Sequence, residues 1–242
     1  MAGNQLLVRF RNLQLRKAEE TLLEVSELDL WAGTCQQITG VNGAGKSRLL
    51  RVLAGLERPE RGEVQVNGPG SSWDQARPWL RSATVFLHQS PYLFDTTVIS
   101  NVAYGLRRRG LRPSAASLQS AEALEWAGMG QLGQRRARSL SPGERQRVAI
   151  LRARVLRPRL LLLDEPLAEL DELAAEQTRF LLRRLLGENM GVVVATNHGR
   201  SLQALADRTL AICAGHLQPV AHGGSPGWRQ RQLGNSRGER AR

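Results

Sequence analysis

Residues 40–47 narrow the choice of folds more than any other segment of the chain. They fit the pattern G-x-x-x-x-G-K-[ST], and they lie between a predicted strand, Thr34–Thr39, and a helical pattern that ends near Gly55. A glycine-rich turn placed between a strand and a helix points backbone N–H groups and the positive end of a helix dipole at phosphate oxygens. The segment therefore predicts a phosphate-binding loop formed by Gly40, Val41, Asn42, Gly43, Ala44, Gly45, Lys46 and Ser47.

The last two residues of this loop have distinct chemical tasks. Lys46 places a compact cation between the β- and γ-phosphates of a nucleotide, and Ser47 presents a hydroxyl to Mg²⁺. All but two of the chain's Lys and Arg residues are arginine, and the two lysines stand at 17 and 46. We interpret the lysine at 46 as a requirement for a point charge. The alternative is a glycine-rich turn with an incidental Gly-Lys-Ser.

Two carboxylates follow a short apolar strand. Leu160–Leu163 is apolar throughout and leads into Asp164 and Glu165. Because a strand covered on both faces can hold a charge only where it emerges, both carboxylates should lie at its carboxyl end, where open α/β sheets bind ligands. Asp164 is suited to hold Mg²⁺, and Glu165 can polarise an attacking water. The alternative is that Asp-Glu-Pro only opens the next loop.

A second apolar strand, Val192–Thr196, ends in Asn197 and His198. A lone histidine at a strand end is more often structural than catalytic. His198 is nevertheless expected at the same sheet edge as Asp164, where it can donate a hydrogen bond to a γ-phosphate.

The remaining patterns predict an α/β fold with a largely parallel sheet covered by helices on both faces. Leu6–Phe10 and Leu22–Leu30 alternate apolar and polar residues, which is typical of antiparallel strands with one wet face. Helical stretches around Thr97–Leu106 and Leu118–Trp126 predict a helical subdomain, about residues 90–140, inserted into this core. Residues 223–242 have little apolar content and predict a basic, disordered tail.

Composition excludes several classes of protein and leaves others open. The formal net charge of +12 is concentrated in residues 105–159, with thirteen Arg against three Glu, and in the tail, with five Arg against one Glu. Nucleic acid, an anionic membrane surface and a bias toward arginine are all compatible with it. No apolar run is long enough to span a bilayer, and no secretory signal is visible. Cys35 and Cys213 are expected to be buried thiols in a reducing compartment.

The order of motifs resembles that of the ATP-binding cassette (ABC) ATPases over residues 5–220. Leu140-Ser141-Pro142-Gly143-Glu144-Arg145-Gln146-Arg147 is similar to the family's signature sequence. Gln89 stands at the position of the Q-loop glutamine, Asp171 at that of the D-loop aspartate, and His198 at that of the switch histidine.

The resemblance implies a P-loop ATPase core with a mixed, mainly parallel sheet, an N-terminal antiparallel β-region and an inserted helical subdomain. It also implies a head-to-tail dimer that binds ATP between the phosphate loop of one copy and the signature of the other. In such a dimer Ser141, Gly143, Glu144 and Asp171 would approach the nucleotide across the interface, while Gln89 would sense Mg²⁺ and the attacking water. Arg16 lies thirty positions before Lys46, where the family has an aromatic residue that stacks on adenine.

Motif spacing separates two classes of ABC ATPase. Chromosome-type members carry a long coiled coil, whereas 52 positions separate Gln89 from Ser141 here; ribosome-acting members usually join two cassettes, and this chain has one. We interpret the chain as the ATP-hydrolysing subunit of a membrane transporter. A soluble ABC ATPase that acts on nucleic acid or the ribosome is the alternative.

Residues 90–106 resemble the segment with which prokaryotic importers contact their permease, and Tyr92 and Phe94 are candidates for that surface. The resemblance implies a permease in a separate chain, a solute-binding protein acting through the permease, and a location on the cytoplasmic face of the cell membrane. The shape fits importers of small inorganic oxyanions, and nearly as well importers of amino acids or metals. No nucleic-acid partner is expected, because the basic block coincides with the insertion and the signature.

Overall fold

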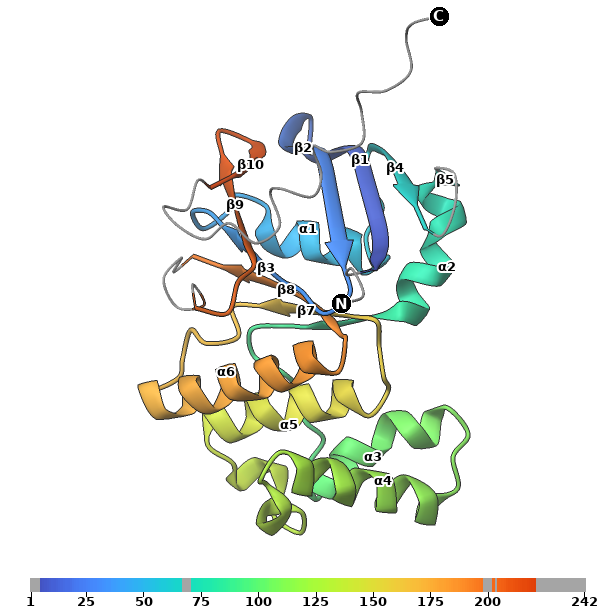
Figure 1. Cartoon of the computed structure of the whole chain (residues 1–242), viewed down its shortest axis with the longest axis vertical. Coiled ribbons are helices and arrows are strands. Elements are labelled where there is room, and N and C mark those ends of the chain that lie inside the picture. The colour runs from blue at the N-terminus through green and yellow to red at the C-terminus, as the bar shows by residue number, and fades with distance from the viewer. Residues whose placement is uncertain (1–4, 67–70, 198–201, 203, 221–242) are drawn as a thin grey trace, which may run out of the picture.

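A computed structural model describes residues 5–66, 71–197, 202 and 204–220. Within these ranges the strands form one sheet in the order β5-β4-β1-β2-β10-β9-β3-β8-β7-β6 (Figure 1). The strands are β1 (Leu6–Lys17), β2 (Glu20–Trp31), β3 (Cys35–Thr39), β4 (Arg61–Gln65), β5 (Ser71–Ser72), β6 (Thr84–Leu87), β7 (Leu160–Asp164), β8 (Gly191–Thr196), β9 (Arg208–Cys213) and β10 (His216–Pro219). The helices are α1 (Lys46–Leu53), α2 (Trp73–Ala83), α3 (Val98–Arg108), α4 (Pro113–Trp126), α5 (Pro142–Arg154) and α6 (Glu172–Gly187).

The sheet has an antiparallel half and a parallel half, which confirms the predicted mixed architecture. β1 pairs with β2 and β4 in antiparallel register, whereas β9, β3, β8, β7 and β6 follow one another in parallel. Both N-terminal strands are longer than predicted, because the alternation of buried and exposed residues continues through Leu13 and Leu15 of β1.

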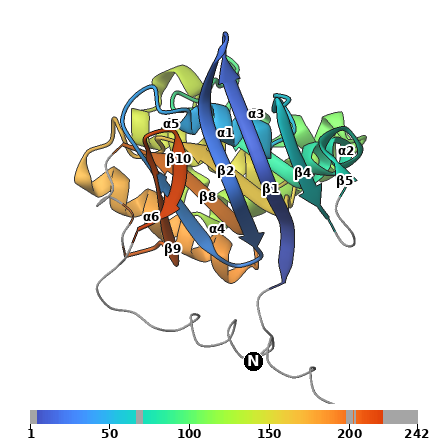
Figure 2. The ribbon, with the colours of Figure 1, turned by 90° about the horizontal axis from the view of Figure 1, so that it is seen from above.

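Alternate residues of the parallel strands enter two separate cores. Leu160 and Leu162 of β7 pack with α1 and with the apolar face of β1 and β2, so α1 lies between the two halves of the sheet (Figures 1 and 2). Leu161 and Leu163 face the opposite way and pack against α5 and α6. The strand is therefore covered on both faces, as its apolar sequence predicted.

The predicted helical subdomain has an apolar core of its own. Val98 and Val102 of α3 pack there against Ala123 and Leu124 of α4 and against Val148 of α5. Figure 1 places α3 and α4 at the end of the molecule away from β1 and β2. The helix expected at Leu118–Trp126 begins earlier, at Pro113, because proline is favourable in a first helical turn.

Some expectations were incomplete or wrong. The sequence did not predict α2, which begins at a capping box formed by Ser72 and Gln75, nor the hairpin of β9 and β10.

Cys213 is exposed, so the prediction that both thiols are buried was wrong for it. Cys35 is buried, and burial raises the pKa of its thiol to about 12. The tail at 223–242 lies outside the described residues.

No helix in the described ranges is long and apolar enough to cross a membrane.

Candidate active site

The predicted phosphate loop joins β3 to α1 and places Lys46 at the first helical position. Gly45 precedes the helix with φ of 99°, and a Cβ atom there would lie 3.2 Å from Leu22 Cδ2, so the position favours glycine twice over. Lys46 is 6% exposed, and its Nζ atom donates to the carbonyl oxygens of Gly40 at 2.7 Å and Val41 at 3.2 Å. The ammonium group therefore lies inside the curl of the loop, where phosphate oxygens were predicted to bind.

The two carboxylates lie beside this loop, at the carboxyl end of β7. Glu165 Oε1 is 4.0 Å from Lys46 Nζ. Asp164 is 4% exposed, and within the described ranges its Oδ1 atom is buried without a hydrogen-bond partner. Lys46 and Glu165 are 119 positions apart in the sequence. They meet because β3, β8 and β7 lie side by side in parallel, so that their carboxyl ends lie together.

The backbone of Glu165 holds its side chain against the end of β8. Its φ of 46° lies in the left-handed region that non-glycine residues seldom adopt, and its N–H group donates to Ala195 O at 2.8 Å. Glu165 Oε1 accepts a hydrogen bond from the N–H group of Asn197 at 2.7 Å. Asn197 Nδ2 in turn donates to Asn42 Oδ1 of the loop at 3.3 Å.

Sequence reasoning gave no role to Asn197, although its place at the strand end was visible. It is the last described residue before His198, which lies outside the described residues. The structure thus places the end of β8 beside Glu165 and the phosphate loop, and it leaves the predicted position of His198 untested.

Gln89 and Glu165 line one small pocket of about 70 Å³, between the segment after β6, the start of α5 and the loop after β7. Ser47 is half-buried at the second position of α1. Arg16 accepts a hydrogen bond at its carbonyl oxygen from Arg48, the residue after Ser47, and its own guanidinium donates to the carbonyl oxygen of Glu19. The backbone of Arg16 therefore contacts α1, the helix that follows the phosphate loop. Its side chain bonds to the turn between β1 and β2.

The predicted signature residues have local roles in the fold. Ser141 caps α5: its Oγ accepts from the N–H group of Glu144 at 3.2 Å, and Glu144 Oε2 accepts from the N–H group of Ser141 at 2.8 Å. A Cβ atom at Gly143 would lie 2.5 Å from Ala174 Cβ, so glycine permits the close approach of α5 and α6. Asp171 caps α6 by accepting from the N–H group of Ala174 at 2.7 Å.

None of Ser141, Gly143, Glu144 and Asp171 forms a hydrogen bond or ion pair with residues 40–47 within the part of the chain that the structure describes. Within the described residues, the predicted signature residues therefore bond to their own helices and not to the phosphate loop.

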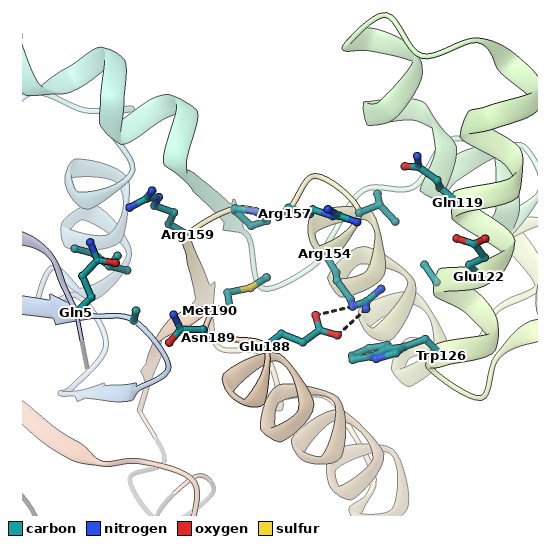
Figure 3. Close-up of a pocket in the computed structure, with 15 residues that line it drawn as sticks. Gln5, Gln119, Glu122, Trp126, Arg154, Arg157, Arg159, Glu188, Asn189 and Met190 are labelled. Carbon is teal, nitrogen blue, oxygen red and sulfur yellow. Dashed lines mark hydrogen bonds and ion pairs between the residues drawn. The ribbon is translucent and has the colours of Figure 1, made fainter. Parts of the chain in front are cut away.

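A larger pocket, of about 860 Å³, lies at the opposite ends of the strands, beside the amino ends of β7 and β8 (Figure 3). Arg159 and Met190, which precede β7 and β8, are among its lining residues. Ligands of open parallel sheets bind beyond the carboxyl ends of the strands, so this pocket is not the predicted nucleotide site. It marks the seam between the helical subdomain and the sheet.

At this seam Trp126, the last residue of α4, contacts side chains of two other helices. The guanidinium carbons of Arg154 from α5 and Arg184 from α6 lie 3.9 and 4.1 Å from the centre of its ring. Arg154 also forms two hydrogen bonds with Glu188, at 2.6 and 3.0 Å (Figure 3). The ring thus joins α4 to two helices that cover the sheet.

We expect Trp126→Ala to destabilise the fold by about 2–3 kcal/mol, because it removes an aromatic side chain and both cation–π contacts. The unfolding temperature, measured by calorimetry, should fall by about 4–12 °C. Trp126→Phe keeps a ring between the two arginines and serves as the matched control. Equal losses for the two variants would show that the cation–π contacts do not stabilise the seam.

A glycine-rich loop at the end of a central parallel strand, with two carboxylates at the carboxyl end of β7, which β8 separates from that strand, defines a P-loop NTPase. Residues 23–168 match the family described as ABC transporter. The chain therefore belongs to the ABC transporter family, as an ATP-binding domain.

Individual relatives agree with this assignment. The chain is 36% identical to the spermidine/putrescine import ATP-binding protein PotA of Rubrobacter xylanophilus, over 90% of this chain and 58% of the relative. It is 37% identical to the sulfate/thiosulfate import ATP-binding protein CysA of Burkholderia mallei, over 90% of this chain and 62% of the relative. The chain thus spans less than two thirds of the length of either protein.

Among solved structures, cbiO1 from Clostridium perfringens, part of the ABC transporter complex cbiONQ, superposes with a TM-score of 0.79. The two sequences are 24% identical, and the match covers 88% of this chain and 86% of cbiO1. This likeness shows the same fold.

Proposed function

We propose that the chain binds ATP with Mg²⁺ at the carboxyl ends of β3, β8 and β7 and hydrolyses it to ADP and phosphate. The observation that carries the proposal is the meeting of Lys46 and Glu165, 4.0 Å apart, beside the buried Asp164. A cation for phosphate, a carboxylate for water and a carboxylate for a metal are the groups that phosphoryl transfer to water requires. We assign residues 5–220 to this ATPase domain.

The residues at the edge fit Mg²⁺. A buried carboxylate oxygen without a hydrogen-bond partner, such as Asp164 Oδ1 within the described ranges, is costly unless a cation or a water satisfies it. Asp164 and the Ser47 hydroxyl offer the oxygen ligands that Mg²⁺ prefers, and Gln89 would sense the ion. Bound Mg²⁺ would neutralise charge on the phosphate oxygens.

Glu165 is assigned the role of general base. Its oxygen Oε1 is fixed by the N–H group of Asn197, which orients the carboxylate toward the loop. The backbone of residues 40–47 would bind the phosphates, and Lys46 would balance their charge. His198 would donate to the γ-phosphate, and Arg16 would lie near the adenine.

We further propose that two copies complete each site. Ser141, Gly143, Glu144 and Asp171 form no hydrogen bond or ion pair with residues 40–47 of their own chain in the described ranges, which is compatible with a role in a second copy. A head-to-tail dimer would bring the N-terminus of α5 to the γ-phosphate held by the partner, where the helix dipole stabilises negative charge. Hydrolysis would then depend on closure of the dimer.

We propose that this ATPase powers the import of a small solute through a permease in a separate chain, with a solute-binding protein acting through the permease. The chain would then lie on the cytoplasmic face of the cell membrane. One relative is named for import of spermidine and putrescine, which are cations, and another for sulfate and thiosulfate, which are anions. Of these classes we favour an inorganic oxyanion, from the shape of the chain.

A cluster of three exposed or half-exposed rings supports a permease contact. Tyr92 and Phe94 pack edge to face at 5.5 Å between ring centres, and Phe94 and Tyr104 lie 4.5 Å apart. Tyr92 is 72% exposed and Tyr104 is 43% exposed. Aromatic residues exposed on a loop are typical of protein interfaces.

We expect Tyr92→Ala to weaken association with the permease by about tenfold, because it removes an exposed aromatic anchor, and to leave the chain's own ATP hydrolysis unchanged. Co-purification with the membrane subunit and phosphate release measure the two effects separately. Leu118→Ala, an exposed apolar residue on α4, is the control. Equal co-purification of the two variants would count against this docking surface.

The alternative, a soluble ATPase that acts on nucleic acid, receives less support from the arginine block. Many of its side chains bind carbonyl oxygens or carboxylates of the chain itself: Arg107, Arg109, Arg135, Arg145 and Arg154. These five arginines contribute to loops and helix ends of the fold, which gives part of the block a role that does not require a phosphate backbone.

A further inference from the structure

A buried glutamine beside the candidate site has an unused hydrogen-bond donor. Gln146 lies in the second turn of α5 and is 3% exposed. Its Nε2 atom is fully buried, and no group in the described ranges accepts a hydrogen bond from it. A buried amide without a partner destabilises the fold, so such groups in proteins usually bind a water or serve a functional site.

Gln146 lines the pocket of about 70 Å³ described above. The same pocket is lined by Gln89 from the segment after β6 and by Glu165 from the end of β7. One water needs a space of about 10–15 Å³ and two to four polar partners. The pocket therefore has both the room and the polar groups to hold an ordered water.

Glu165 has an oxygen available to such a water. Its Oε1 atom accepts from Asn197 and faces Lys46. Its Oε2 atom forms no hydrogen bond or ion pair within the described part of the chain. A carboxylate accepts hydrogen bonds at both oxygens, and a second one fixes the rotation of the group.

We infer that Gln146 is a positioning residue for Glu165. Its Nε2–H group donates to a water in the pocket, and that water donates to Glu165 Oε2. This inference rests on the proposed function, in which Glu165 is the general base. It gives a physical connection within one copy between α5, whose first turn carries the signature, and the base of that copy's own site. Movement of α5 on dimer closure would thus reach the carboxylate that accepts the proton.

The experiment compares Gln146→Met, which keeps the length and apolar stem but lacks the donor, with Gln146→Asn, which keeps the amide. In the full chain we expect Gln146→Met to lower kcat about tenfold with KM for ATP unchanged, because only the orientation of the base is lost. Gln146→Asn should stay within about threefold of the wild-type rate, since a water can span the missing methylene. Gln119→Met, an exposed glutamine on α4, controls for the substitution itself.

A double-mutant cycle distinguishes positioning from a structural role. In the Glu165→Gln background, Gln146→Met should cause no further loss in single-turnover phosphate release, since the group it positions is gone. A tenfold loss in both backgrounds, or a wild-type kcat for Gln146→Met, would overturn the inference. If Gln146→Met fails to fold, Gln146→Ser is measured in the same cycle. If Glu165→Gln itself turns over at the wild-type rate, the proposed base is wrong, and this result is separate from those for Gln146.

Discussion

Replacing Glu165 by glutamine is expected to lower the rate of ATP hydrolysis by about 10²–10⁴-fold while ATP binding persists. The amide has nearly the same shape as the carboxylate but cannot accept a proton from water. The contact with the N–H group of Asn197 can be retained by the amide oxygen, so the site should stay assembled. Phosphate release measures the rate, and titration calorimetry with ATP measures binding.

Glu169→Gln is the matched control for this prediction. Glu169 is exposed and lines the same small pocket, so its substitution changes the local charge equally without touching the proposed base. We expect its rate to stay within about twofold of wild type. If the two variants lost activity to the same extent, the loss would come from pocket charge, and Glu165 would not be the base.

Replacing Lys46 by methionine is expected to weaken ATP binding by about 10- to 100-fold, because a charged donor to the phosphates is removed from the centre of the loop. Lys46 is 6% exposed, so no water molecule can easily substitute for its ammonium group. Equilibrium binding of a fluorescent ATP analogue measures the effect.

Lys17→Met removes the chain's other lysine and provides a control with the same change of charge. Lys17 is exposed at the end of β1 and should not affect binding. Unchanged affinity in Lys46→Met would refute the phosphate-loop assignment. A similar loss in both variants would indicate that net charge, and not the position of the lysine, governs the affinity.

The phosphate loop and the acidic strand were predictable because each is a local pattern whose geometry follows from its own residues. Glycine at position 45 is needed for a left-handed backbone, and four leucines before Asp164 leave no place for a charge except the strand end. The parallel order of β3, β8 and β7 then brings the two segments together.

Other features depend on neighbours that are distant in the sequence. Glycine is required at position 143 because Ala174 approaches it closely. The role of Asn197 arises from a hydrogen bond to Glu165 between the ends of the neighbouring strands β8 and β7. Nothing in the local sequence separates Gln146 from the other polar residues of α5. Its Nε2 atom, which has no hydrogen-bond partner among the described residues, is recognised only where three distant segments line one pocket.

Release of phosphate in a single turnover tests the central proposal, that the site at the carboxyl ends of β3, β8 and β7 hydrolyses ATP with Mg²⁺. The full chain is held in excess over γ-labelled ATP, with Mg²⁺ or with a chelator. We expect labelled phosphate to appear with Mg²⁺ at a rate that Glu165→Gln lowers by about 10²–10⁴-fold, and not to appear with the chelator. ATP that remains intact although it is bound with Mg²⁺, or equal phosphate release with the chelator, would contradict the proposal.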